Sequence, residues 1–505
     1  IRDRLFRESL GRLSRKLATE VVNPVYLETF TACKLIPLDK SPGVRPIGVG
    51  EVMRRIVGKT VSWVAKSEAR DAAGPLQVAA GIKSGAEGAI HAMREIFEED
   101  ETEAVILIDA RNAFNCMNRS VALHNIQIIC PEIATYLINI YRRPSRLIIR
   151  GNRNKGEEIT SFEGTTQGCN LGMIFYCLGQ ITMLRNLQGL IELKNLDCRQ
   201  VWLADDATAI GKLMDIRRWF DSLVDQGLRQ GYYVNETKTW IILKHETLLE
   251  KAKQIFTGTN VQFTTDGKRH LGACLGSKEY KESYCTKMVL KWCKEVENLA
   301  EIARFHPHAA YSGYVNSFQH KYTYFQRTIP GLEEYVKPLD DLLTYVFIPT
   351  LFGGPVTDIE RKLISLPTRY GGLNIHILSD KAPRDYLAST AITKRLTDAI
   401  KSHSYEVPSI DHDLIRDVKN KMEARFQQEK ETLMNQVSPC TKRMLEVLSQ
   451  KGSSNWLVAL PIQDQGFVLN RTEFVDALNL RYGRELRGIP RTCVCGAQFN
   501  VTRTH

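Results

Sequence analysis

Three aspartates occupy positions where carboxylates could perform chemistry. Asp109 follows an apolar run, and Asp205 and Asp206 form an adjacent pair between two further apolar runs. An Asp-Asp pair by itself more often marks a solvated turn. Here the flanking apolar residues predict two strands with the pair at the hairpin tip, where neighbouring carboxylates are costly unless they bind a cation. Because Mg²⁺ prefers carboxylate oxygens, the three side chains are candidate magnesium ligands.

Cations that could bind phosphate occur in residues 31–48, whose pattern predicts two strands joined by a Ser-Pro-Gly turn. Arg45 offers a planar fork that can bind two phosphate oxygens, whereas Lys34 and Lys40 are point charges. Solvated strand edges also carry lysines, so Arg45 is the stronger candidate.

A glycine-punctuated loop at residues 164–172 should position further residues, among them Gln167 and Gly168. It opens an apolar helix that we expect to run through residue 189, and its glycines let a ligand or another backbone approach closely. Before this loop, residues 118–141 have helical periodicity and residues 146–162 predict a β-hairpin.

Helical periodicity with basic residues appears in three other stretches. Residues 1–30 could form a nucleic-acid-binding arm or a plain amphipathic helix. Residues 285–350 interleave cations with aromatics, a pattern typical of a surface that follows a phosphate backbone and equally of a helical core. Residues 410–450 predict a basic helix, whose outer face could simply be solvated.

Composition limits the class of protein. The 505 residues are 43% hydrophobic and 25% charged, which predicts an ordinary globular protein with several sub-domains. The net charge of +11 suits a polyanionic partner, although this signal is weak by itself. No apolar run approaches the roughly 18 residues that span a membrane. The twelve cysteines lack the spacing of a disulfide framework, so we expect a reducing intracellular compartment.

The order of these segments resembles the reverse transcriptases, and within them those of non-LTR retrotransposons of the R2-like type, over about residues 30 to 490. The segments that carry the resemblance are Arg45-Pro46-Ile47, Gln77 to Gly81 with Ser84 and Glu87, Asp109 with Phe114, Thr166-Gln167-Gly168, Leu203-Ala204-Asp205-Asp206, Gly231 through Asn235 to Lys238, His270-Leu271-Gly272, Leu366 to Leu373, and Trp456 to Gly483.

The resemblance implies an α+β right-hand polymerase fold, followed by a mostly α-helical linker. The implied regions are an N-terminal helical extension at 1–30, fingers at 31–100, a palm at 101–280 with a helical and hairpin insertion at about 118–163, a thumb at 281–355, the linker at 356–490 and a partial zinc knuckle at 491–505.

The resemblance also implies a role for each candidate residue. Asp109 and Asp205 are expected to bind two Mg²⁺ ions that promote an in-line displacement at phosphorus, with Asp206 as an accessory ligand. The other implied roles are a general acid at Lys238, triphosphate binding by Arg45 with Lys34 or Lys40, exclusion of a ribonucleotide 2′-hydroxyl by Phe114, lining of the nucleotide pocket by Gln167 and Gly168, and a primer grip at His270, Leu271 and Gly272.

A second metal is suggested at the end of the chain, where Cys493, Cys495 and His505 could bind Zn²⁺. A tetrahedral structural site needs a fourth ligand, and whether His505 is a true ligand stays open. Because the chain starts at Ile1 and ends just after this cysteine pair, we expect a piece of a longer polypeptide that lacks the family's endonuclease.

The leading hypothesis is therefore an RNA-directed DNA polymerase of a retrotransposon, which extends a DNA 3′ end on an RNA template by target-primed reverse transcription. Its expected partners are element RNA, a DNA primer or target DNA, and deoxynucleoside triphosphates, with no membrane; synthesis in the cytoplasm and action in the nucleus would follow. An RNA-dependent RNA polymerase is one alternative, against which Phe114 argues. A non-catalytic RNA-binding scaffold is another, against which the intact carboxylates argue.

Overall fold

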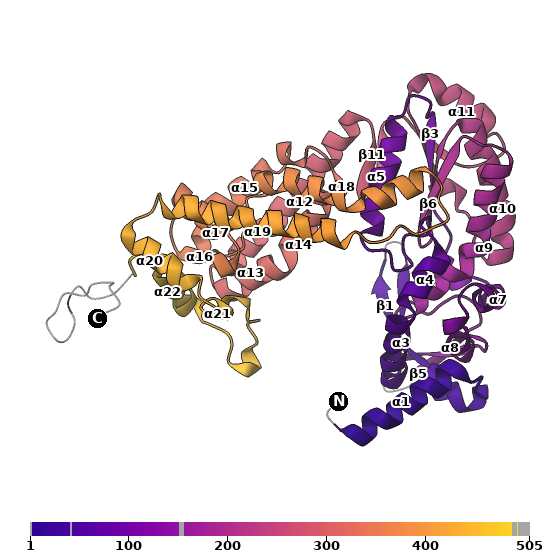
Figure 1. Cartoon of the computed structure of the whole chain (residues 1–505), viewed down its shortest axis with the longest axis horizontal. Helices are drawn as coiled ribbons and strands as arrows, with labels where there is room; N and C mark the ends of the chain where they lie inside the picture. The colour runs from indigo at the N-terminus through magenta and orange to yellow at the C-terminus, as the bar shows by residue number, and fades with distance from the viewer. Residues whose placement is uncertain (1–2, 41–42, 151–155, 487–491, 493–505) are drawn as a thin grey trace. The chain divides into compact units, whose positions relative to one another are not determined.

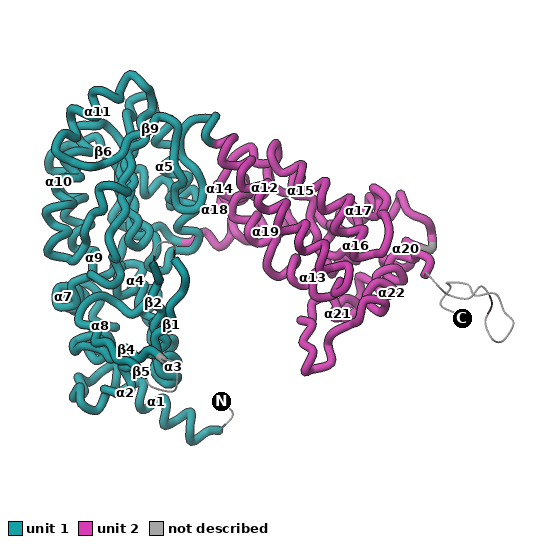
Figure 2. The backbone as a smooth tube through the Cα atoms, turned by 180° about the vertical axis from the view of Figure 1, so that it is seen from behind, with its two compact units in different colours: residues 1–280, 393–409 teal, residues 281–392, 410–505 magenta. Residues whose placement is uncertain are grey.

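The computed structural model describes residues 3–40, 43–150, 156–486 and 492. The chain divides into two compact units, which Figure 2 shows in different colours. Unit 1 contains residues 1–280 and 393–409, and unit 2 contains residues 281–392 and 410–505. The fold is α+β, and the strands of the described residues all lie in unit 1.

A five-stranded sheet forms the centre of unit 1. Its strand order is β6-β7-β3-β8-β9, antiparallel except for the last pair. The strands are β6 (Cys198–Leu203), β7 (Asp206–Gly211), β3 (Ala104–Ile108), β8 (Trp240–Leu243) and β9 (Gln262–Thr264).

Helices cover both faces of this sheet, as Figure 1 shows for α5 (Gly85–Glu98), α9 (Gly172–Leu193) and α10 (Leu213–Gln230). The central strand β3 is a nearly continuous apolar run because both of its faces are buried. Ile106 packs into the core with α9 and α10, and Val105 packs into the core with α5. This two-sided burial holds the carboxyl end of β3, where Asp109 follows, in a fixed place.

A four-stranded sheet with the order β2-β1-β4-β5 forms the second sheet of unit 1. Its strands are β1 (Cys33–Asp39), β2 (Val44–Gly50), β4 (Ser145–Arg150) and β5 (Gly156–Ser161). The hairpins β1–β2 and β4–β5 confirm the strand pairs predicted from the sequence, and β1 joins them by pairing parallel with β4.

Several helices of unit 1 surround the two sheets. They are α1 (Arg4–Thr19), α2 (Glu28–Thr31), α3 (Val52–Val64), α4 (Lys66–Ala73), α6 (Ala113–Cys116), α7 (Arg119–Ile129) and α8 (Pro131–Tyr141). Of these, α1, α7 and α8 fall in stretches predicted to be helical. The periodic stretch at 118–141 is two helices because Pro131 lacks the N–H that a continuous helix needs and instead starts α8. A short helix, α11 (Leu249–Ile255), and the hairpin of β10 (Gly267–His270) and β11 (Ala273–Gly276) complete the unit.

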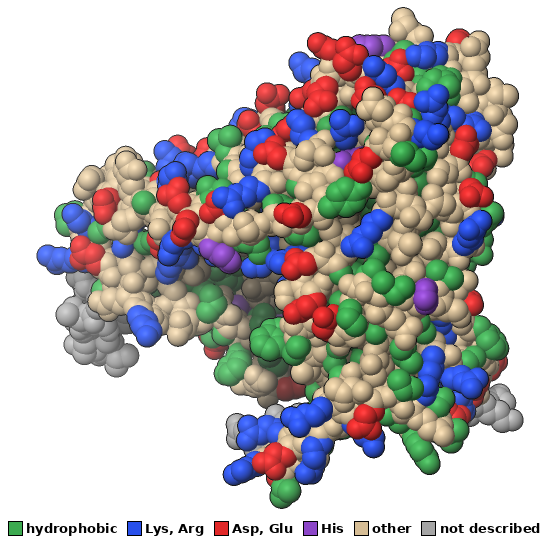
Figure 3. All heavy atoms as spheres, turned by 45° about the vertical axis from the view of Figure 1, so that its right-hand side comes forward, with side chains coloured by type: hydrophobic (Ala, Val, Ile, Leu, Met, Phe, Trp, Pro, Cys, Tyr) green, Lys and Arg blue, Asp and Glu red, His purple; other side chains and the backbone are tan. Residues whose placement is uncertain are grey.

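The N-terminal helix α1 buries Leu17 while Arg4 and Leu5 stay exposed. The C-terminal part of this helix therefore packs against the protein, and its first turn faces solvent. On the face drawn in Figure 3, basic and acidic side chains are interspersed over much of the surface.

The secondary-structure elements in the described residues of unit 2 are helices. Its helices are α12 (Lys278–Ala303), α13 (Pro307–Gly313), α14 (Gln319–Thr328), α15 (Lys337–Leu342), α16 (Ile348–Phe352), α17 (Asp358–Ser365), α18 (Leu378–Lys401), α19 (His412–Met434), α20 (Pro439–Leu448), α21 (Asn455–Val458) and α22 (Arg471–Arg481). The start of α12, up to Tyr280, and the end of α18, from Thr393, belong to unit 1. Across the part of the chain that the structure describes, no helix combines the length and apolar character needed to cross a membrane.

Aromatic side chains build the core between α12 and α14. Trp292 lies 4.9 Å from Tyr322 and 4.8 Å from Phe325, measured between ring centroids, and all three rings are buried. For these residues the core interpretation of the 285–350 pattern is correct. The predicted boundaries of fingers, palm, thumb and linker stay predictions.

Candidate active site

The paired aspartates lie at the tip of the β6–β7 hairpin, as the sequence predicts. Leu203 pairs with Asp206, so Ala204 and Asp205 are the two turn residues. Ala204 has a φ of 57°, in the left-handed region where a Cβ costs about 1 kcal/mol or more. The turn must therefore be held by contacts outside the hairpin.

Asp109 reaches the same edge of the sheet from β3. The β3–β7 register ends with Ile108 opposite Ala207, and its continuation by one pair sets Asp109 across from Asp206. Asn235 orients Asp109, because its Nδ2 donates to Asp109 Oδ2 at 3.0 Å and its backbone N–H donates to the Asp109 carbonyl at 2.7 Å. The register and Asn235 together aim Asp109 toward the hairpin tip.

Two buried side chains hold the turn itself. The backbone N–H of Ala204 donates to Gln77 Oε1 at 2.9 Å, and Gln77 Nε2 donates to the Ala204 carbonyl at 3.1 Å. The Tyr232 hydroxyl donates to the Asp205 carbonyl at 2.8 Å. The backbone on both sides of the Ala204–Asp205 peptide is thus anchored to other elements of unit 1.

The electrostatics of the tip favour a cation. Burial, followed by the charge of Asp109, raises the pKa of Asp205, whereas Arg45 and Lys40 oppose the rise. Asp206 is exposed, yet loss of hydration to the surrounding protein, followed by the charges of Asp205 and Asp109, raises its pKa to about 6. These carboxylates repel one another, and a bound divalent cation would offset that repulsion.

The donor set therefore fits Mg²⁺ by charge and by ligand type. Among the described residues, no three His, Cys, Asp or Glu side chains lie close enough together to hold a metal ion. The sheet register makes Asp109 and Asp206 neighbours at the end of the β3–β7 pair, and Asp205 precedes Asp206 in the turn.

A cavity of about 510 Å³ adjoins Asp205. Its lining gathers five further residues singled out in the sequence. They are Lys40, Arg45, Phe114, Gln167 and Gly168. The cavity thus combines cations, an aromatic ring and a catalytic-type carboxylate drawn from four separate segments of unit 1.

Close backbone contact shapes one wall of this cavity. The N–H of Gly48 in β2 donates to the Gln167 carbonyl at 2.7 Å. Gly168 has a φ of 107°, and a Cβ built on it would lie 2.7 Å from the Gly48 carbonyl oxygen. Only glycine fits here without displacement, and this contact joins the glycine loop to the strand that carries Arg45.

Four of the predicted catalytic and nucleotide-binding residues lie outside the cavity lining: Asp109, described above, and Lys34, Lys238 and Asp206. Lys34 is exposed on β1, six residues before Lys40, which places the two roughly 20 Å apart along the strand. Lys238 is exposed at the end of a 3₁₀ turn, Glu236–Lys238, next to Asn235. Asp206 lies at the hairpin rather than in the lining. Of the two lysines proposed for the triphosphate, only Lys40 is near the cavity.

The predicted primer grip is the tip of the β10–β11 hairpin. Leu271 and Gly272 form its turn, with φ values of 46° and 89°. His270, which precedes Leu271, is buried, and a nitrogen of its ring is hydrogen-bonded to Thr208 Oγ1 at 3.0 Å. Burial lowers the pKa of His270 to about 3, so the ring is neutral and turned into the protein. A primer contact at this hairpin would use Leu271 and Gly272.

Both turn residues, Leu271 and Gly272, have left-handed backbone conformations, which let the chain reverse within two residues.

The predicted zinc ligands Cys493, Cys495 and His505 lie outside the described residues.

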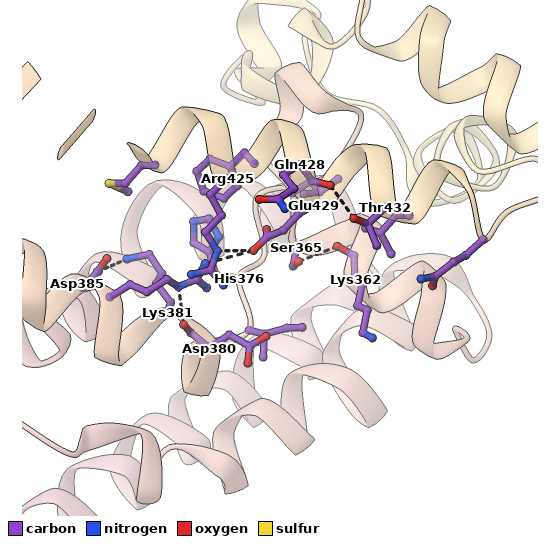
Figure 4. Close-up of a pocket in the computed structure, with 17 residues that line it drawn as sticks. Lys362, Ser365, His376, Asp380, Lys381, Asp385, Arg425, Gln428, Glu429 and Thr432 are labelled. Atoms are coloured by element: carbon purple, nitrogen blue, oxygen red, sulfur yellow. Dashed lines mark hydrogen bonds and ion pairs between the residues drawn. The ribbon is translucent and has the colours of Figure 1, made fainter. Parts of the chain in front are cut away.

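A second cavity, of about 420 Å³, lies in unit 2 among α17, α18 and α19 (Figure 4). Its charged groups pair with one another. Arg384 and Arg425 both contact Glu429, at 3.4 and 2.7 Å, and Lys381 pairs with Asp385. The lining also contains the carboxylates of Asp380, Asp385 and Glu429, which oppose a polyanion, so the cavity beside Arg45 and Lys40 is the better candidate for binding one.

Sequence reasoning missed the supporting roles of Gln77, Tyr232 and Asn235. All three stand inside segments that carry the family resemblance, which is the one signal that could have singled them out. The partners of Gln77, Tyr232 and Asn235 are 127, 27 and 126 residues away along the chain, so no local pattern reveals the contacts.

Comparisons with known proteins give only distant similarity. No family model and no curated protein sequence matches the chain. Solved structures of telomerase do match. Apo telomerase from Candida tropicalis is 12% identical, with 82% of this chain and 73% of that chain covered and a TM-score of 0.42. Telomerase from Candida albicans in complex with a TWJ fragment of telomeric RNA is 10% identical, covering 80% and 71%, with a TM-score of 0.39.

The telomerase from Candida tropicalis truncated from its C-terminal domain is 15% identical, with a TM-score of 0.35. That match covers 47% of this chain and 54% of the truncated telomerase. The chain therefore spans about half the length of this relative.

Proposed function

We propose that this chain is an RNA-directed DNA polymerase, a reverse transcriptase that extends a DNA 3′ end on an RNA template. The observation that carries the proposal is the single cavity lined by Asp205, Arg45 and Phe114 together with Lys40, Gln167 and Gly168. Asp109 and Asp206 lie at the adjoining sheet edge. A nucleotidyl-transfer site needs carboxylates, phosphate-binding cations and a wall against the sugar in one place.

Each residue then has a role in the reaction. Asp109 and Asp205, with Asp206 accessory, would hold Mg²⁺, which when bound supplies charge neutralisation and nucleophile activation for in-line displacement at phosphorus. Arg45 and Lys40 bind and orient the triphosphate of the incoming nucleotide. Phe114 forms the wall that excludes a 2′-hydroxyl. Lys238 would donate a proton to the departing pyrophosphate.

We further propose, from the order of the motifs along the chain, that the polymerase belongs to a retrotransposon. The chain would be the polymerase part of a non-LTR element of the R2-like type and would use a nicked DNA target as primer. Fingers and palm would lie in unit 1, a thumb at 281–355 and a linker at 356–490, with zinc bound at the C-terminus. Element RNA, target DNA and deoxynucleoside triphosphates are the proposed partners, and the nucleus the proposed compartment.

Primer extension tests this function. The purified chain is given an RNA template, a DNA primer and Mg²⁺ with either deoxynucleotides or ribonucleotides. Asp205→Asn should abolish synthesis while RNA binding persists, because the substitution removes a metal ligand and keeps the side-chain shape. Asp225→Asn, at an exposed position on α10, is the matched control and should retain synthesis.

The outcomes separate the alternatives. Incorporation of deoxynucleotides alone, lost in Asp205→Asn, supports a reverse transcriptase. Efficient ribonucleotide incorporation would instead support an RNA-dependent RNA polymerase. RNA binding without synthesis under either condition would support a scaffold and contradict the proposal.

A further inference from the structure

We propose that Gln77 is a positioning residue for Asp205, and that its double hydrogen bond to Ala204 sets the affinity of the hairpin tip for a divalent cation. This inference rests on the proposed function, because it assigns a metal-binding role to Asp205. Gln77 itself touches neither substrate nor metal.

The geometry of Gln77 is that of a clamp. Its side chain is fully buried. The backbone around it forms an isolated parallel bridge to β6: Val78 N–H donates to the Trp202 carbonyl at 2.9 Å, and Trp202 N–H donates to the Leu76 carbonyl at 2.7 Å. From that fixed origin the carboxamide extends past the end of β6 and bonds both polar backbone groups of Ala204.

The turn needs such a clamp for two reasons. Ala204 adopts a left-handed conformation that an alanine does not favour, so the turn stores strain that free hairpins avoid with glycine. The charges of Asp205 and Asp109 also act on Asp206, a repulsion that disfavours three closely spaced carboxylates. Gln77 opposes both by fixing the peptide group that precedes Asp205.

Fixing that peptide fixes the direction in which the Asp205 side chain leaves the backbone. The carbonyl of Asp205 is held from the other side by the Tyr232 hydroxyl. Because both neighbouring peptides are anchored, the Asp205 carboxylate can move only by rotation about its own side-chain bonds. Asp205 therefore loses less conformational entropy when a metal ion binds. Outer contacts of this kind typically change metal affinity about 10–100-fold when removed.

The test is a substitution that removes both bonds at similar side-chain length, Gln77→Met. The matched control is Gln200→Met. Gln200 is likewise fully buried and stands in β6, but its Oε1 accepts hydrogen bonds from the indoles of Trp202 and Trp219, at 3.1 and 3.0 Å, and not from the turn. Both variants lose buried hydrogen bonds, and only one loses the clamp.

Metal binding is measured without polymerisation. Tb³⁺ luminescence excited through the indole of Trp202, which all variants keep, reports occupancy of the tip, and Asp205→Asn identifies the part of the signal that belongs to this site. Mg²⁺ displaces Tb³⁺ in a titration, and primer extension is followed over the same Mg²⁺ range. Unfolding midpoints of all variants show how much stability each has lost.

We expect Gln77→Met to weaken metal binding about 10–100-fold and to shift the Mg²⁺ dependence of synthesis to higher concentration, with Gln200→Met close to wild type. Tyr232→Phe removes only a hydroxyl, and it should weaken binding in the same direction if Gln77→Met does not fold. Unchanged metal affinity in these variants, in a wild-type chain that does bind metal and synthesise DNA, overturns the inference alone. If the wild-type chain neither binds metal nor synthesises DNA, both the inference and the proposed function are overturned.

Discussion

The ring of Phe114 stacks on the ring of Tyr176, with centroids 4.3 Å apart and ring planes inclined by 18°. Tyr176 is buried in α9, so it backs Phe114 from the side away from the cavity. Because protein interiors are closely packed, the two stacked rings can move little. If Phe114 is the wall against a 2′-hydroxyl, its rigidity comes from Tyr176.

Loss of this wall should relax sugar selection. Phe114→Ala is expected to increase ribonucleotide relative to deoxynucleotide incorporation by about 10–100-fold, since steric discrimination of one small group is typically worth 1–3 kcal/mol. The ratio of kcat/KM for the two nucleotide classes is the measurement. Tyr176→Leu should move the ratio in the same direction by less, and Tyr176→Phe, which keeps the stack, should leave it near wild type. An unchanged ratio in Phe114→Ala would contradict the assignment.

Arg45 and Lys34 should behave differently although both were candidates for the triphosphate. Arg45→Gln is expected to raise KM for deoxynucleotides about 10-fold or more, because a charge-assisted hydrogen bond contributes roughly 1.5–3 kcal/mol. Lys34→Gln removes the same charge from the same strand pair outside the cavity lining and should change KM little. Steady-state kinetics at fixed template and primer make the comparison. Equal effects of the two substitutions would mean that long-range charge, and not contact, binds the nucleotide.

Gly168 should be intolerant of a side chain. Gly168→Ala must displace the Gly48 carbonyl and strain a left-handed backbone, so we expect a loss of stability of about 1–3 kcal/mol and weaker nucleotide binding. Gly189→Ala in α9 is the control, because an added Cβ there meets no atom within 4 Å and the helix favours alanine. Chemical denaturation and KM report the two effects. A Gly168→Ala protein as stable as wild type would show that β2 moves freely.

We expect the folded protein to become less stable as the pH is lowered, because of His403. This ring is buried, its Nε2 accepts a hydrogen bond from the Gln200 N–H at 2.7 Å, and burial lowers its pKa to about 3 from an ordinary 6.5. The unfolded chain therefore binds a proton that the folded chain does not. The contribution is complete above pH 6.5 and is lost as the pH falls toward 3, by up to about 1.4 kcal/mol per pH unit.

The measurement is urea unfolding of wild type and His403→Asn between pH 7 and 5. Asparagine tolerates the φ of 54° at this position, so the variant removes the titrating ring, and with it the hydrogen bond from Gln200, without new backbone strain. The slope of stability against pH, and not its absolute value, therefore reports the proton. We expect a flatter pH dependence in His403→Asn, with His270, whose pKa is also lowered to about 3, still contributing its share. His124→Asn on the exposed side of α7 controls for loss of a histidine. Parallel curves for His403→Asn and wild type would contradict the prediction.

Local patterns accounted for much of the fold. The Asp205–Asp206 hairpin tip, the β1–β2 and β4–β5 pairs and the start of α9 follow from alternation of apolar residues and from turn chemistry, which act over a few neighbouring residues. The aromatics of α12 and α14 were ambiguous because periodicity does not distinguish a surface from a core. Packing resolved that ambiguity for Trp292.

The sequence by itself determined which residue types were available for chemistry: carboxylates at two strand ends, cations on a strand pair and a glycine where two backbones meet. Only the tertiary structure decided that Lys40 and not Lys34 reaches the cavity, that His270 turns inward, and that Gln77 holds Ala204. The physical reason is distance. Turn and strand preferences are set within about ten residues, whereas the contacts that orient Asp205 join segments 127 residues apart, and sheet register and side-chain packing alone bring those segments together.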